Sequence, residues 1–390
     1  PQTFYVADSK TVKSVAAEKE MIRLASWDDC RKSKEVFAES FRKFEEESSR
    51  YNGPGFIQPH DENRFVVVNP PGPAITTEAL DAIYALPYTM EPHPRYRNKG
   101  DIPAFEMIKN SITIHRGCFG GCSFCALTVH QGRFITSRSH QSVLKETKQL
   151  TDKPWFRGHI SDLGGPSANM YGMTPLKTEL CHKCRRPSCI FPGICKNLND
   201  NPESLTKLYR EVAAVKNVKK ITIGSGIRYD LHLSRKSSFM RQHKEYLEEL
   251  FDNHISGYLK VAPEHSEPHV LSAMRKPSFE LFAEFYEMFR KFNHRKNKKQ
   301  FMVPYIISSH PECTLGDMHM VKKKLNQMGL NPEQVQDFMP TPMTLSSVIF
   351  YSGINPYTGK KVFTEKVPAA KKIQKSVFFE NNIKHNKYRK

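Results

Sequence analysis

Between residues 111 and 342, short apolar segments alternate with segments whose apolar residues have helical spacing. This alternation predicts parallel βα units, because successive parallel strands are normally joined by crossover helices. Several of the segments are nearly continuous apolar runs, as expected of strands buried on both faces of a sheet. The six strand candidates are SITIHRG (111–117), RGHISDLGG (157–165), KKITIGSG (219–226), GYLKVAPEH (257–265), QFMVPYIISSH (300–310) and EQVQDFMPTP (333–342).

The fold class expected from this pattern is α/β, with the six units forming a partial (βα)6 barrel of the TIM type. Polar or unusual residues occur at the carboxyl ends of the strand candidates, where βα barrels build their active sites. They include Cys118, Asp162, Ser225, His265, His310 and Thr341. A doubly wound open sheet is the structural alternative, since alternation of strands and helices is common to both folds.

Four segments are expected along the chain. Residues 1–55 are predicted to be a helical N-terminal extension, the end of a longer upstream domain, with one helix from Lys13 to about Arg50. Residues 56–110 are expected to be an irregular linker with one short strand, since prolines interrupt them. Residues 111–345 form the barrel core, and residues 346–390 a C-terminal extension with a basic, disordered tail.

Seven of the nine cysteines fall in two tight groups, which favours metal binding over disulfides. The first group is Cys118, Cys122 and Cys125, in a loop whose glycines, at positions 117, 120 and 121, can adopt positive φ angles. Three thiolates leave one metal position open for an outside ligand. A zinc site that takes a distant fourth ligand is the alternative. Cys30 and Cys313 stand alone and are expected to be buried, incidental thiols.

The spacing Cys118-x3-Cys122-x2-Cys125, with Phe124 before the last cysteine, resembles the signature of radical S-adenosylmethionine (SAM) enzymes. Most of residues 60–370 is similar to the YgiQ-like (UPF0313-type) radical SAM proteins. The segments that carry this resemblance are HRGCFGGCSFCALTVHQGR, SDLGGPSANMYG, CHKCRRPSCIFPGIC, YLKVAPEH and QVQDFMPTPMTLSSVIFYSGINP. The resemblance implies a barrel of the radical SAM type.

The resemblance also implies a function. Cys118, Cys122 and Cys125 would bind a [4Fe-4S] cluster whose open iron takes SAM. Reductive cleavage would yield a 5'-deoxyadenosyl radical that abstracts hydrogen from an unidentified substrate, and the electron would come from a reductant such as flavodoxin or ferredoxin. No catalytic side chain is assigned.

Five further residues match positions that contact SAM in this superfamily. Gly164 and Gly165 resemble the Gly-Gly-Glu segment, although Pro166 replaces the glutamate, so only a backbone role carries over. Ser225 and Glu264 end strands where ribose or carboxylate contacts are common, and Phe124 would pack beside the adenine. A cap or turn role for Ser225 and Glu264, and a core-plug role for Phe124, are the alternatives. The tetrad from His130 to Arg133 is part of the resemblance but has no assigned reaction.

The second group is Cys181, Cys184, Cys189 and Cys195, four thiols within 15 residues of a proline-rich loop. Four soft ligands at this spacing can close a tetrahedral zinc site or hold an auxiliary iron-sulfur cluster. Both readings stay open on the sequence alone.

The formal net charge is +19, and residues 289–299 and 371–390 together contribute +12 of it. Such a distribution is compatible with nucleic-acid binding, but solvated helix ends are the commoner origin of charge runs. One alternative to the first function is a metal-stabilised nucleic-acid-binding module. The other is an RNA-modifying enzyme, because YLKVAPEH followed by VLSAMRKP resembles a segment of the radical SAM methylthiotransferases, which modify tRNA. No signal peptide or membrane span is recognisable, so a cytoplasmic protein without a membrane partner is expected.

Overall fold

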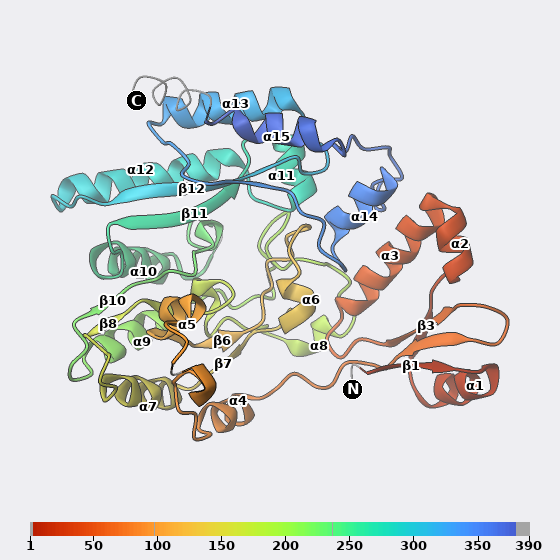
Figure 1. Cartoon of the computed structure of the whole chain (residues 1–390), viewed down its shortest axis with the longest axis horizontal. Coiled ribbons are helices and arrows are strands. Elements are labelled where there is room, and N and C mark those ends of the chain that lie inside the picture. The colour runs from red at the N-terminus through yellow and green to blue at the C-terminus, as the bar shows by residue number, and fades with distance from the viewer. Residues whose placement is uncertain (1–2, 97, 236, 380–390) are drawn as a thin grey trace.

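The computed structural model describes residues 3–96, 98–235 and 237–379. It has a mixed α/β fold in which an N-terminal unit lies beside a larger body of parallel strands and helices (Figure 1). None of the described helices is long and apolar enough to span a bilayer.

The N-terminal unit is a four-stranded sheet with three helices. The strand order is β1-β4-β3-β2, in which β2 and β3 pair in parallel and the other pairs are antiparallel. A small core of buried residues, including Ile57, Phe65 and Val67, fills the space between sheet and helix α1. The elements are β1 (Phe4–Ala7), α1 (Ser9–Glu18), β2 (Met21–Arg23), α2 (Trp27–Lys32), α3 (Lys34–Ser48), β3 (Gly55–Pro59) and β4 (Phe65–Val68).

This unit corrects two expectations. The single helix expected from Lys13 to about Arg50 is three helices interrupted by β2, because residues 21–23 pair with β3 more than 30 positions later in the chain. The sheet also crosses the expected boundary at residue 55, since β3 and β4 complete it. The segment 56–110 is therefore not a linker with one short strand. It contains these two strands and the helices α4 (Thr77–Tyr84) and α5 (Pro103–Ile108).

All six predicted strand segments contain strands in the structure. Consecutive segments pair in parallel: β5 with β9, β8 with β10, β11 with β12 and β12 with β13. A parallel bridge joins Ile227, the residue directly after the third segment, to Val261 in the fourth. The strands are β5 (Ser111–Thr113), β6 (His115–Arg116), β7 (Thr136–Ser137), β8 (His159–Ile160), β9 (Asp162–Gly164), β10 (Lys220–Ile221), β11 (Tyr258–Glu264), β12 (Phe301–Ser308) and β13 (Val335–Asp337).

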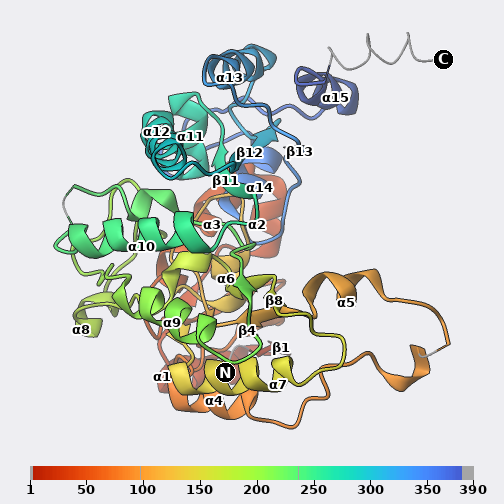
Figure 2. The ribbon, with the colours of Figure 1, turned by 90° about the vertical axis from the view of Figure 1, so that its left-hand side faces the viewer.

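Helices α7, α9, α10, α12 and α13 follow one another along one side of these strands (Figure 2). Their apolar faces and the strands form the main core, which is rich in aromatic rings such as Phe282, Phe285 and Phe289. No pairing joins β13 to β5 within the described part of the chain, so closure of a barrel is not observed. The helices are α6 (Leu127–Gln131), α7 (His140–Thr151), α8 (Thr178–Cys181), α9 (Glu203–Ala213), α10 (Met240–Asn253), α11 (Pro268–Met274), α12 (Phe279–Arg295), α13 (Leu315–Gln327), α14 (Leu345–Ser352) and α15 (Pro368–Ser376).

The C-terminal extension packs on the body. Helix α15 lies against β12, β13 and α13, and its buried Gln374 accepts a hydrogen bond from the backbone N–H of Ser309 at 2.9 Å. The basic tail expected to be disordered lies, from residue 380 onward, outside the described residues.

Candidate active site

The first cysteine loop lies directly after β6, where the first predicted strand ends. Gly117 and Gly121 have positive φ angles of 89° and 60°, as expected, whereas Gly120 does not. A Cβ atom at Gly117 would lie 2.3 Å from the carbonyl oxygen of Phe134, and one at Gly121 would lie 2.2 Å from that of Pro187. Both glycines are therefore required by close backbone approach as well as by their φ angles.

A buried ion pair controls the polar surroundings of this loop. Arg228 donates a hydrogen bond from Nη1 to the Cys122 sulfur at 3.2 Å, and its Nη2 lies 2.6 Å from the Oδ2 atom of Asp230. Burial alone would raise the pKa of Asp230, but the Arg228 guanidinium beside it holds that pKa below the usual range. Arg228 thus presents a fixed positive charge to the cysteine sulfurs.

The cysteines themselves are largely shielded from solvent. Burial raises the pKa of the Cys118 thiol to about 12 and also raises the pKa of Cys125. Thiols in such surroundings are neutral until a metal ion displaces their protons. The loop is therefore suited to metal coordination, and free thiolates are disfavoured.

Cys122 and Cys125 line a cavity of about 610 Å³ between the N-terminal unit and the body. Residues between 44 and 56 and between 68 and 75 form one wall, and the segment 128–134 forms much of the other. Arg275, which also lines the cavity, makes a two-point ion pair with Glu45 of α3 at 2.7 and 2.8 Å. The cavity is large enough for a small molecule and is built from both parts of the chain.

Four of the predicted SAM contacts lie at or shortly after strand ends, and Phe124 lies in the first cysteine loop. None of the five is among the residues that line this cavity. A Cβ at Gly164 would lie 2.1 Å from the Ser225 hydroxyl, and one at Gly165 would lie 2.5 Å from the His115 ring. The Ser225 hydroxyl donates to Asp162 at 2.9 Å, and Phe124 packs edge-on against His310. The close approach of Ser225 to Gly164, and of the His115 ring to Gly165, explains why glycine occupies these two positions.

Glu264, although distant from the cysteine loop in sequence, lies near Cys125 in the fold. It ends β11 with a positive φ of 69°, is buried, and lies 3.8 Å from the Lys276 ammonium group. Burial raises the pKa of Glu264, and the charges of Lys276 and Arg228 oppose that rise. Its carboxyl group contributes, with Lys276, to the electrostatic surroundings of Cys125.

Sequence reasoning did not single out Arg228, Asp230, Lys276 or His115. The first two follow the third strand segment by only a few residues, so their place after a strand end was the available signal. All four residues of the tetrad line the cavity, and Arg133 also borders the second cysteine group, to whose sulfurs its guanidinium donates.

The second cysteine group surrounds a separate cavity of about 730 Å³. Among the described residues, no three His, Cys, Asp or Glu side chains are arranged so that they could hold one metal ion. This holds for both cysteine groups, so neither forms a ready site for a single ion. The two isolated cysteines, Cys30 and Cys313, are buried as expected.

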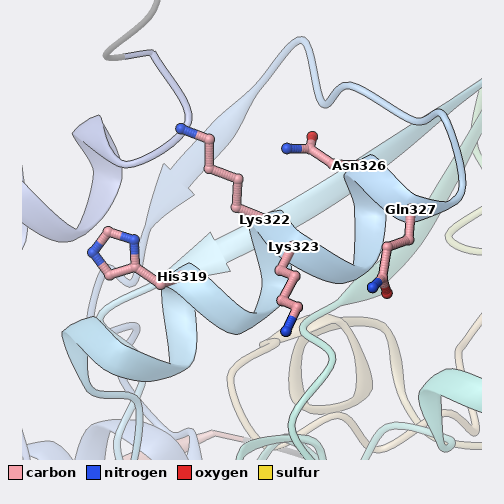
Figure 3. Close-up of a pocket in the computed structure, with 5 residues that line it drawn as sticks. All are labelled: His319, Lys322, Lys323, Asn326 and Gln327. Carbon is pink, nitrogen blue, oxygen red and sulfur yellow. The ribbon is translucent and has the colours of Figure 1, made fainter.

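Most basic side chains of the run 289–299 are ion-paired. In residues 289–299, the side chains of Arg290, Lys291, Arg295, Lys296 and Lys298 lie within 3.7 Å of carboxylates. A shallow hollow on α13 is lined by His319, Lys322, Lys323, Asn326 and Gln327, all from one helix (Figure 3). Among the described residues, none from another element lines this hollow, so it lacks the geometry of a built ligand site.

Comparison with known proteins gives three kinds of match. Residues 2–111 match the Radical SAM N-terminal family. A UPF0313 protein of Bacteroides thetaiotaomicron is 48% identical over 97% of this chain, which covers 61% of that protein. UPF0313 proteins of Methanosarcina acetivorans and Clostridium botulinum are 45% and 41% identical over 92% and 94% of this chain, which covers 47% and 56% of them.

Among solved structures, the radical SAM methyltransferase TsrM of Kitasatospora setae, with cobalamin and a [4Fe-4S] cluster bound, aligns with a TM-score of 0.40 at 13% identity. The alignment covers 62% of this chain and 38% of TsrM. The same enzyme with tryptophan and a SAM analogue bound aligns with a TM-score of 0.35 over 59% and 35% of the two chains. Scores this low support no argument about mechanism.

Proposed function

This chain is a radical SAM sequence of the UPF0313 type, and on that premise we propose that it binds a [4Fe-4S] cluster and SAM and uses them as a radical SAM enzyme. Cluster and SAM together supply the chemistry, a reductive cleavage to a 5'-deoxyadenosyl radical that abstracts hydrogen from a substrate. The chain spans only about three fifths of the length of its Bacteroides relative. The activity of the whole protein is therefore proposed here as well.

The residues of the first loop fit such a cluster. Cys118, Cys122 and Cys125 offer three soft sulfur ligands, and two of them line the 610 Å³ cavity from which a further ligand could reach the site. This opening of the cysteine loop onto a large cavity is the observation that carries the proposal.

The protein groups around the loop would hold and shield the site. Arg228 would offset thiolate charge at Cys122, and Asp230 would keep the guanidinium in place. The N-terminal unit forms one wall of the cavity, so it would limit access of water to a reactive species. Lys276 and Glu264 would set the local charge near Cys125.

Phe124, Gly164, Gly165, Ser225 and Glu264 remain proposed contacts for SAM, and the six parallel units are proposed to form a partial barrel of the radical SAM type. The electron donor, flavodoxin or ferredoxin, and the cytoplasmic location also remain proposals. RNA modification and nucleic-acid binding are not carried forward, because the basic run 289–299 is largely ion-paired.

The test is reductive cleavage of SAM by the anaerobically reconstituted chain. We expect 5'-deoxyadenosine to form with dithionite as reductant, measured by liquid chromatography and mass spectrometry. The Cys125→Ser variant should lose at least about a hundredfold of this rate, since the cluster loses a ligand. Cys30→Ala, a change at a buried cysteine in α2 outside the site, is the matched control and should retain the rate.

The outcome that contradicts the proposal is equally specific. Wild-type protein with a full complement of iron and sulfide that forms no 5'-deoxyadenosine would exclude the reaction. Equal rates for Cys125→Ser and the wild type would exclude the assigned ligand.

A further inference from the structure

The four cysteines of the second group line one cavity. Cys181, Cys184, Cys189 and Cys195 contribute to the walls of the 730 Å³ space, together with apolar residues that include Phe119 and Met173. The cysteines come from α8 and the loop that follows it, and the cavity is bounded on the other side by residues 133–135.

A buried guanidinium points into this group. Arg133 is only 6% exposed, and its Nη2 atom donates to the sulfurs of Cys189 and Cys184 at 3.4 and 3.7 Å. Its Nη1 atom donates to the carbonyl oxygens of Ser49, at 2.6 Å, and Arg186, and its Nε atom has no hydrogen-bond partner. No carboxylate lies within ion-pair distance of Arg133 in the part of the chain that the structure describes.

A buried cation without an anionic partner is expensive. The groups placed to neutralise Arg133 are the cysteine sulfurs, and they become anionic when they bind a metal. The arrangement therefore calls for a centre that keeps several of these cysteines as thiolates.

We propose that Cys181, Cys184, Cys189 and Cys195 bind a second [4Fe-4S] cluster, and that Arg133 is its buried hydrogen-bond donor. This inference does not depend on SAM cleavage, since a cluster with four cysteine ligands needs no exchangeable ligand.

The open space that the four cysteines line favours a cluster over zinc. Zinc–sulfur bonds of about 2.3 Å in a tetrahedral site bring all sulfur pairs to within ~3.8 Å. No three metal-binding side chains in the described residues could hold one ion, and the cysteines instead surround an open space. In a cubane each thiolate binds a different iron, so the ligands lie farther apart and the inorganic core fills the space between them.

The second site would adjoin the first. The backbone N–H of Cys189 donates to the carbonyl oxygen of Phe119 at 3.1 Å, and the Ser188 hydroxyl donates to that of Gly120 at 2.7 Å. Cys118, Cys189 and Cys195 also pack against one shared apolar cluster that contains Phe119. A cluster at the second site would therefore lie in the wall next to the first cysteine loop.

The test is metal analysis of the full chain after anaerobic reconstitution. Two clusters predict about eight irons and eight sulfides per chain, with zinc well below one. The variant Cys118→Ser/Cys122→Ser/Cys125→Ser should retain about four irons with an electron paramagnetic resonance signal that SAM does not alter. The variant Cys184→Ser/Cys189→Ser should also hold about four irons, but at the first site.

Three outcomes overturn the proposal: one zinc per chain in the triple variant, about four irons in the wild type with none in the triple variant, or an iron content that Cys184→Ser/Cys189→Ser leaves unchanged. If circular dichroism shows that a variant does not fold, the wild-type counts decide, since eight irons require two cubanes. Failure of SAM cleavage would leave these counts unaffected, so the two proposals fail separately.

The role of Arg133 as a hydrogen-bond donor can be tested separately, by the midpoint potential of the second cluster. Arg133→Met should shift the midpoint potential of the second cluster to more negative values, because a positive donor to its ligands is lost. Arg64→Met, which removes an exposed arginine of the N-terminal unit, is the control and should leave the potential unchanged. Equal potentials for Arg133→Met and the wild type would overturn its assignment as donor.

Discussion

His115 is completely buried beside Gly165, and neither of its ring nitrogens has a hydrogen-bond partner in the described structure. Burial lowers its pKa from 6.5 to about 4, and the neighbouring Arg116 charge acts in the same direction. The folded chain therefore keeps this imidazole neutral at pH values at which the unfolded chain protonates it.

This difference predicts a loss of stability in weak acid. Since the unfolded state binds the extra proton between the folded pKa of about 4 and the unfolded value of 6.5, the free energy of unfolding should fall as the pH falls through this window. Lowering the pH from 7.5 to 5 should cost about 2 kcal/mol at this residue alone. Urea unfolding of the wild type and His115→Asn at both pH values measures it, and the variant should lose about that part of the pH dependence.

The control is His319→Gln, which removes an exposed imidazole on α13 and should keep the wild-type pH dependence. If His115→Asn and the wild type lost the same free energy between the two pH values, the neutral state of His115 in the folded chain would be ruled out.

Some residues of the candidate site could be predicted from the sequence, and others could not. The cysteines, the glycine pair and Glu264 could be selected because their types and spacing are distinctive at strand ends. Arg228 could not, because the contact that makes it relevant, with Cys122 more than 100 positions earlier, depends on tertiary packing. Arg133 belongs to the tetrad that the resemblance includes, but its contacts with two cysteine sulfurs and two carbonyl oxygens of distant segments could not be predicted.

At the scale of elements, local pattern predicted the parallel units well and the N-terminal unit poorly. Strands β11 and β12 are seven and eight residues long and rich in apolar residues, so they can be recognised from the sequence. Strand β2 is only three residues long and is stabilised by its pairing with β3. Short strands of this kind are fixed by non-local hydrogen bonds, which a sequence window does not contain.

One ion pair between the N-terminal unit and the body can be tested directly. Glu45 on α3 pairs at two points with Arg275, which ends α11, and accepts a hydrogen bond from Tyr357 at 2.6 Å. Both charged side chains are largely buried, at 17% and 10% exposure, so Glu45→Gln leaves the guanidinium poorly compensated. We expect a loss of about 2–4 kcal/mol in the free energy of unfolding, measured in urea.

Glu39→Gln is the matched control on the same helix, because its ion pair with Arg42 is exposed and should contribute less than about 1 kcal/mol. Equal destabilisation by the two substitutions would show that the Glu45–Arg275 pair does not fasten α3 to the body.

At the scale of the whole molecule, the 610 Å³ cavity beside the first cysteine loop exists only because the N-terminal unit docks on the body. The domain boundary expected near residue 55 did not predict this cavity, because the segment 44–56 belongs to the N-terminal unit and also forms part of the cavity wall. The Cys-rich insertion takes part in the docking: Arg185 pairs with Glu47 at 2.6 Å, and the Tyr51 backbone N–H donates to the Cys181 carbonyl oxygen at 3.0 Å.

These contacts link the proposed second cluster to the rigidity of the junction. Arg133 touches both the cysteines and the Ser49 carbonyl oxygen, so a centre that fixes the cysteines should also fix residues 47–53. Hydrogen–deuterium exchange should therefore be at least about tenfold faster in residues 47–53 of Cys184→Ser/Cys189→Ser than in the reconstituted wild type, a local difference of ~1.4 kcal/mol. Amides of β11 and β12, which lie in the main core, serve as the internal control and should exchange equally in both proteins. Unchanged exchange at residues 47–53, in a variant shown to have lost about four irons, would mean that the junction is held by the protein contacts alone and that the cluster has no part in docking the two units.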